Sequence, residues 1–235
     1  MSVNYNTSFF TRIPDLLLDA ANKKSYSGSG TTWNDLSSYK SIYSSTSGTY
    51  PSWSSKYFTF INNGTVTNTI VSSTQNLTTY SQLVYTRIAW IYPTAYSGAW
   101  SPVICNQIGN NNDMCLGLNS SGNILFHQYT TTNDYSLTGN VVVPLNTWSQ
   151  IAMVVNRSSS TINFYFNGTL DATVSTTTIG NSASDTIVIG GAYTDSYGGG
   201  RMFKGNISLV MHYNGLLSNG DIRNNFNAFR GRYGL

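Results

Sequence analysis

The carboxylates of this chain do not form the pairs on which acid–base hydrolysis depends. All nine acidic residues among its 235 residues are Asp, and Glu is absent. Glycoside hydrolysis needs two carboxylates that lie about 5 to 9.5 Å apart. No two Asp residues lie two positions apart on a predicted strand, and Asp15 and Asp19 fall beside Pro14 and at the end of a strand. The sequence therefore predicts a protein that is not an enzyme, with a glycoside hydrolase as a remote alternative.

The two histidines, His127 and His212, are not placed for catalysis either. Each lies in a predicted apolar strand, where a single histidine is more often a packed residue than a base. Neither has a nearby Ser or Cys in the sharp strand-to-helix turn that presents a nucleophile. We expect both to be structural.

The two cysteines could form a disulfide. Cys105 and Cys115 are equidistant from a turn centred near Asn110, so they could face each other across a hairpin. Because we expect the chain to be made in a cytosol, two reduced thiols in a core are the favoured state.

The elements that would position all these residues are β-strands, and the clearest are a three-strand meander over 147–175. An apolar, β-branched run over 151–155 is typical of a strand buried on both faces. Over 162–166 apolar and polar residues alternate, as in a strand with one face in a core. The dipeptide Asn167-Gly168 favours a two-residue hairpin turn. A further stretch, 81–92, is apolar on both faces and predicts a central strand.

A second block, 186–213, has a strand that ends in Ile-Gly-Gly, a glycine-rich loop and a pattern F-x-G-x-I before a last apolar strand. In order and spacing, these two blocks resemble the core of the concanavalin A-like lectin/glucanase superfamily, in its laminin-G-like branch. The resemblance implies an all-β fold, a two-sheet antiparallel jelly-roll sandwich. That fold hosts lectins, hydrolases and adhesion modules alike, so it does not by itself give the function.

Both ends of the domain resemble laminin-G-like proteins of bacteriophages and other viruses. The segment 16–38 is similar to an opening that recurs in them, in which a strand precedes a Gly-Ser loop held to the core by Trp33 and Leu36. The segment 218–234 is similar to their closing motif. In it Ser218 and Asp221 resemble a capping box that begins a short helix.

Length and composition predict one domain with an uncharged polar surface. We expect an extended arm over 1–14 and the jelly roll with a short C-terminal helix, ending near Gly231, over 15–235. Charged residues make up 9% of the chain, against about 25% in average proteins. Such a surface suits a particle or fibre whose subunits cover one another, although an AT-rich genome would also produce it. No basic cluster exceeds Lys23-Lys24, which argues against a nucleic-acid partner.

The resemblance also suggests binding sites on the loops at the rim of the sandwich. Laminin-G-like domains often hold calcium there, and the oxygen-rich turns around Asp113 and Asp195 suit that ion. Asp and Asn also occur in turns for backbone reasons alone, which is the favoured explanation. Exposed rim aromatics could stack on sugars or contact other subunits. The candidates for that role are Tyr96, Trp100, Tyr193 and Tyr197.

Together these features predict a non-enzymatic virion structural protein, such as a capsid-decoration, head-fibre or tail-fibre subunit. Its expected partners are other virion proteins, further copies of itself and a host-surface glycan. No signal peptide or membrane-spanning stretch is visible, so we expect synthesis in the host cytoplasm and export as part of a virion. The alternative is a carbohydrate-binding lectin.

Overall fold

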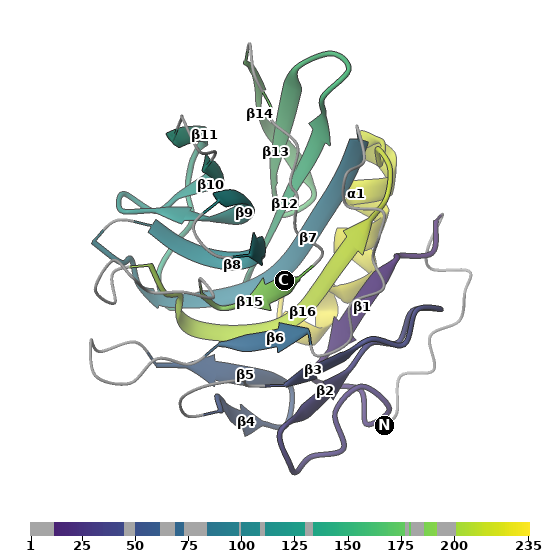
Figure 1. Cartoon of the computed structure of the whole chain (residues 1–235). Helices are drawn as coiled ribbons and strands as arrows, with labels where there is room; N and C mark the ends of the chain where they lie inside the picture. Colours follow the sequence, from purple (N-terminus) through teal and green to yellow (C-terminus); the bar gives the residue numbers. More distant parts are fainter. Residues whose placement is uncertain are drawn as a thin grey trace.

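The strands of the chain form two sheets that face each other (Figure 1). The structure is a computed structural model, and it describes residues 12–44, 50–61, 69–72, 84–98, 100–108, 111–129, 134–176, 179, 186–191 and 201–235. Every pairing between described strands is antiparallel. The predicted two-sheet antiparallel jelly roll is confirmed.

Each sheet contains eight of the described strands. The first sheet consists, in spatial order, of β14 (Thr169–Ser175), β13 (Thr161–Phe166), β12 (Ser149–Asn156), β7 (Val84–Ala95), β16 (Lys204–Tyr213), β5 (Tyr57–Phe60) and β4 (Ser52–Ser54), with β1 (Leu16–Asp19) also paired to β16. The second consists, in the same sense, of β11 (Asp134–Val142), β10 (Asn123–Tyr129), β9 (Asn111–Asn119), β8 (Trp100–Ile108), β15 (Ile187–Ile189), β6 (Ile70–Ser72), β3 (Ile42–Ser44) and β2 (Thr32–Asn34).

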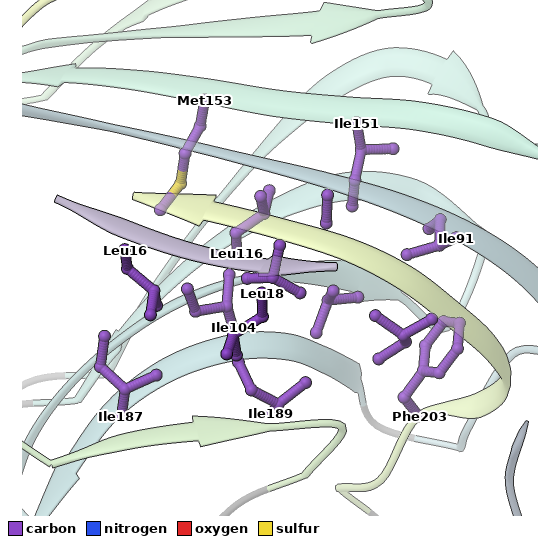
Figure 2. Close-up of a cluster of buried hydrophobic side chains, with 14 of the residues drawn as sticks. Leu16, Leu18, Ile91, Ile104, Leu116, Ile151, Met153, Ile187, Ile189 and Phe203 are labelled. Carbon is purple, nitrogen blue, oxygen red and sulfur yellow. The ribbon is translucent and has the colours of Figure 1, made fainter. Parts of the chain in front are cut away.

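Apolar side chains from both sheets meet in one core (Figure 2). On β12, Ile151 and Met153 point into this core because successive residues of a strand face opposite sides. They meet Ile104 and Leu116 from the second sheet, and all four are fully buried. Alternate residues of each strand therefore build the interior of the sandwich.

The opposite face of β12 is also apolar, because a helix covers it. Ala152 and Val154 belong to a second buried cluster with Ile222 and Phe229 of α1 (Asn219–Phe229). Figure 1 shows α1 lying against the first sheet. The prediction that this strand is buried on both faces is therefore confirmed. No helix among the described residues is long and apolar enough to cross a membrane.

The helix begins and ends as predicted, and a 3-10 turn follows it. Ser218 and Asp221 form the capping box: Ser218 Oγ accepts from Asp221 N, and the Asp221 carboxylate accepts from Ser218 N at 2.9 Å. Helix α1 ends at Phe229 with Arg230 as its C-cap, so Gly231 occupies the predicted position directly after the cap. The chain continues as a 3-10 turn over Arg230–Tyr233, and Gly234 takes the left-handed conformation with φ 77°. This extension carries Tyr233 over Trp90 of β7, with ring centroids 4.1 Å apart.

The meander β12–β13–β14 has the predicted hairpin turn. Asn167 and Gly168 have φ values of 47° and 75°, as a type I′ turn requires. A Cβ at Gly168 would come within 2.7 Å of Phe226 Cβ, so the turn is also pressed against α1. Residue 168 must therefore be glycine for two reasons.

The start of the domain follows the predicted pattern. Leu16 and Leu18 lie in β1, and the Trp33 side chain is fully buried. Asp35 holds the following loop, because its carboxylate accepts from the backbone N–H of Leu17 at 2.9 Å. Most of the predicted 1–14 arm lies outside the described residues, so the arm stays a prediction.

The expectation of two reduced thiols is wrong. Cys105 and Cys115 occupy directly opposite positions on β8 and β9, with 4.1 Å between their Cα atoms, and they form a disulfide. The expectation assumed a reducing cytosol. Adjacent strands of the hairpin, however, bring the two opposite cysteines close enough to form an S–S bond. Trp100 and Leu125 bury the bond.

Both histidines are packed, as expected, and His212 lies in a buried polar cluster. Its ring stacks on Tyr85 with centroids 5.8 Å apart, and its Nε2 is 3.0 Å from Asn214 Oδ1. Nε of the buried Arg87 donates to His212 Nδ1 at 3.5 Å, and its Nη1 donates to the carbonyls of residues 104 and 114. Burial, together with the Arg87 charge, lowers the pKa of His212 well below 6.5.

This shift makes stability fall in mild acid. Below pH 6.5 the unfolded chain binds a proton at His212 that the folded chain does not. From this residue, the free energy of unfolding should therefore fall by about 1.4 kcal/mol for each pH unit below 6.5. Above pH 6.5 His212 is neutral in both states, so this loss of stability is absent. Urea unfolding between pH 7.5 and 5 measures how the free energy of unfolding changes with pH. In His212→Gln the part of this change that comes from His212 should be absent. Equal slopes for both proteins would contradict the prediction.

Candidate functional site

Of the four predicted rim aromatics, the structure describes Tyr96 and Trp100. The Trp100 side chain is 5% exposed and stacks on His127, with centroids 4.3 Å apart. The expectation of an exposed ring there is wrong, because this residue begins β8 and packs over the disulfide. Tyr96 is half-buried against the main core, and its hydroxyl donates to the Val143 carbonyl. Tyr193 and Tyr197 lie outside the described residues.

Neither calcium candidate has a described side chain. Asp113 lies on β9 opposite Tyr129, but its side chain is not described, and Asp195 lies outside the described residues. Among the side chains that are described, no group of three or more His, Cys, Asp or Glu could hold a metal. Calcium binding at these two positions therefore stays a prediction.

A different group of aromatic rings gathers on the outer face of the first sheet. Trp90 is fully buried between Phe226 of α1 (5.6 Å between ring centroids) and Tyr233. Beyond the end of the helix the series continues, because Trp148 lies 4.8 Å from Tyr233 and 5.6 Å from Tyr57. The rings change from buried to half-buried along this series. Helix α1 and the 3-10 turn thus cover one end of an aromatic strip and leave the other end accessible.

The accessible end is a pocket of about 330 Å³, at the small end of the usual range for ligand sites of about 300–1,000 Å³. Three parts of the chain build it: the β4–β5 turn, the loop before β12 and the 3-10 turn after α1. Its lining residues are Ser54, Ser55, Lys56, Tyr57, Trp148, Arg232 and Tyr233.

Hydrogen bonds fix the walls of this pocket. The Tyr233 hydroxyl donates to Ser208 Oγ at 2.8 Å, and Ser208 Oγ in turn donates to the backbone carbonyl of Lys56. The turn that carries Lys56 is tight, since Ser55 has a φ of 41°. Burial raises the pKa of Tyr233, so its hydroxyl keeps its proton and this bond even in alkaline solution. The pocket is therefore preorganised.

A buried ion pair anchors the cationic wall. Arg232 Nη1 donates to Asp19 Oδ1 at 2.7 Å, and the side chains are 12% and 0% exposed. Burial raises the pKa of Asp19, while the neighbouring Arg232 charge acts in the opposite direction. The guanidinium also packs 5.3 Å from the centre of the Phe229 ring. These contacts join the first strand of the sheet to the turn after α1.

The described lining of the pocket offers groups that can bind a ligand. None of its seven lining residues is Asp, Glu, His or Cys, so the lining lacks the paired carboxylates of a glycosidase. It offers instead the faces and edges of aromatic rings, hydroxyl groups and two cations. This combination is typical of a site that holds a polar ligand with apolar faces.

A match to a known family shows to which superfamily the chain belongs. Residues 63–223, more than half of the chain, match the family model described as the concanavalin A-like lectin/glucanases superfamily. The chain belongs to the concanavalin A-like lectin/glucanase superfamily. The resemblance seen in the sequence is thereby confirmed. No curated protein matches the sequence.

Solved structures share the fold of this superfamily member at low identity. A structure of botulinum neurotoxin type C, which depends on two ganglioside molecules to enter cells, is 14% identical with a TM-score of 0.69 over 95% of this chain and 53% of that one. The binding domain of botulinum neurotoxin DC, in complex with rat synaptotagmin II, is 17% identical with a TM-score of 0.65 over 92% and 51%. The chain thus spans about half the length of these structures.

The pocket of this superfamily member is not apparent from its sequence. Tyr57, Trp148 and Tyr233 lie far apart along the chain, and only the pairing of β5, β7, β12 and β16 brings them together. The one available signal is that Trp148 and Tyr233 are large aromatics at the ends of the predicted meander and helix. Large rings at the ends of elements are more often capping contacts than ligand contacts, so that signal is weak.

Proposed function

We propose that this chain is a non-catalytic, carbohydrate-binding module and that the pocket between the β4–β5 turn and the 3-10 turn holds the sugar. The observation that supports this proposal is the half-buried Trp148, flanked by Tyr57 and Tyr233 in a preorganised pocket with polar groups at its edge. The C–H face of a pyranose is apolar and its rim carries hydroxyls. Such a ligand matches aromatic walls edged by Ser, Lys and Arg.

The comparisons support a binding function in general terms. The superfamily includes lectins, and the similar neurotoxin structures come from proteins that bind a ganglioside or a protein receptor. Because the chain spans about half of those structures and shares few residues with them, they do not identify its ligand. The pocket itself carries the proposal.

The experiment is a glycan array probed with the purified chain, followed by calorimetric titration of each glycan that binds. Trp148→Ala should weaken binding by about tenfold, which corresponds to about 1.4 kcal/mol. Tyr39→Ala is the matched control, because Tyr39 is 41% exposed and does not line the pocket. Thermal unfolding of both variants checks that the fold is kept. The proposal fails if no glycan binds, or if Trp148→Ala binds as tightly as the original protein.

We further propose that this module works on the surface of a virion, as a decoration or fibre subunit. The phage-type motifs over 16–38 and 218–234 and the low charge of the chain support this setting. The Cys105–Cys115 disulfide also fits a protein that works outside a reducing cytosol. Light scattering of the purified chain, with and without a calcium chelator, tests it. A stable trimer or larger assembly is expected, and a monomer under all conditions would favour a lectin that acts alone.

A further inference from the structure

We propose that the sugar taken by this pocket is acidic, with its carboxylate held by Lys56 and Arg232. This inference rests on the proposed function and adds the chemical class of the ligand. Both cations line the pocket, and its described lining contains no acidic side chain. A neutral sugar would contact the aromatic walls but would gain nothing from the charge of Lys56.

Lys56 is the cation available to a ligand. Its side chain is exposed, and its ammonium group has no hydrogen-bond or ion-pair partner among the described residues. Its backbone is fixed, because its carbonyl accepts the hydrogen bond from Ser208. A charged side chain therefore projects from a rigid turn at the edge of an aromatic pocket.

Arg232 supplies directed donors rather than net charge. Asp19 lies behind it, fully buried, and balances its charge through Nη1. The guanidinium carries five N–H donors in a planar fork, so further donors can reach an acceptor in the pocket. That fork matches the two oxygens of a carboxylate, whereas a hydroxyl accepts one bond at a time. The pocket as a whole thus has a charge of one positive unit, from Lys56, and a fixed guanidinium beside it.

The arrangement also orients the ligand. Trp148 and Tyr233 are neighbours, and the Arg232 guanidinium lies 6.0 Å from the centre of the Tyr233 ring. A pyranose that stacks on Trp148 would therefore direct one edge toward Arg232 and Lys56. A carboxylate on that edge would accept from both cations while the ring keeps its aromatic contact.

The test is calorimetric titration with a panel of uronic acid and sialic acid oligosaccharides, each paired with its own methyl ester. The ester keeps the ring and removes the negative charge. Each acid that binds should do so about tenfold more tightly than its ester in low salt, and the difference should shrink as salt is added. Lys56→Gln should weaken binding of the acid several-fold and leave binding of the ester unchanged. Lys23→Gln, which removes an exposed charge away from the pocket lining, should change neither.

The outcomes distinguish the proposal of an acidic ligand from the proposal of carbohydrate binding on which it rests. Equal affinities for acid and ester, or an equal loss for both in Lys56→Gln, would overturn the acidic ligand. If in that case Trp148→Ala still weakened binding, carbohydrate binding would stand without a preference for charge. If no sugar of the panel or of the array bound at all, both proposals would fall.

Discussion

Alanine in place of Trp90 is expected to lower the free energy of unfolding by about 3–5 kcal/mol, the range for a large aromatic side chain removed from a core. The Trp90 side chain is fully buried and lies between Phe226 and Tyr233, with interplanar angles of 10° and 18°. Its removal leaves a cavity between the first sheet and α1. Urea unfolding followed by circular dichroism measures the loss.

The control for this experiment is Tyr39→Ala, a substitution at an exposed loop position that should change stability by less than about 0.5 kcal/mol. Trp90→Ala should also weaken sugar binding, because Tyr233 rests on the indole ring and forms a wall of the pocket. A loss of stability below about 1 kcal/mol would mean that α1 does not pack on this ring.

Removal of the disulfide should give the second large effect. The double substitution Cys105→Ala and Cys115→Ala should destabilise the fold by about 2–3 kcal/mol, since the bond closes a short loop with a sequence separation of 10. The measurement is the urea midpoint with and without reducing agent. Reduction should shift the midpoint of the original protein and leave that of the double variant unchanged.

A thiol assay in denaturant gives an independent check of the same bond. The unreduced protein should show no free thiol, and the reduced protein should show two. Two free thiols before reduction would restore the expectation drawn from the sequence.

The fold was largely predictable because its signals are local. Alternation along β13, the turn at Asn167-Gly168 and the capping box at Ser218 each depend on residues a few positions apart. Such patterns are set by local backbone geometry, so they can be recognised in the sequence without the tertiary structure. The 3-10 turn over Arg230–Tyr233 was not predicted, because it depends on the tertiary packing of Tyr233 on Trp90.

The candidate site was not predictable for the opposite reason. Tyr57, Trp148 and Tyr233 come from three separate parts of the chain, and no spacing relates them. Trp100 was expected on the surface because the residues before it read as a loop. Its ring is in fact buried on the outer face of the second sheet, over the Cys105–Cys115 bond. A sequence pattern shows that a ring is large and apolar, but tertiary packing decides whether it is exposed.

The position of β16 has a consequence for synthesis of the protein. This strand pairs with β7 on one side and with both β1 and β5 on the other, so it joins the two halves of the first sheet. Until residues 204–213 have left the ribosome, the three earlier strands keep open edges that could pair with other chains. Folding is therefore expected to be slow, because its central contacts join residues far apart in the chain. Nascent chains of this protein would depend on chaperones to keep these edges apart.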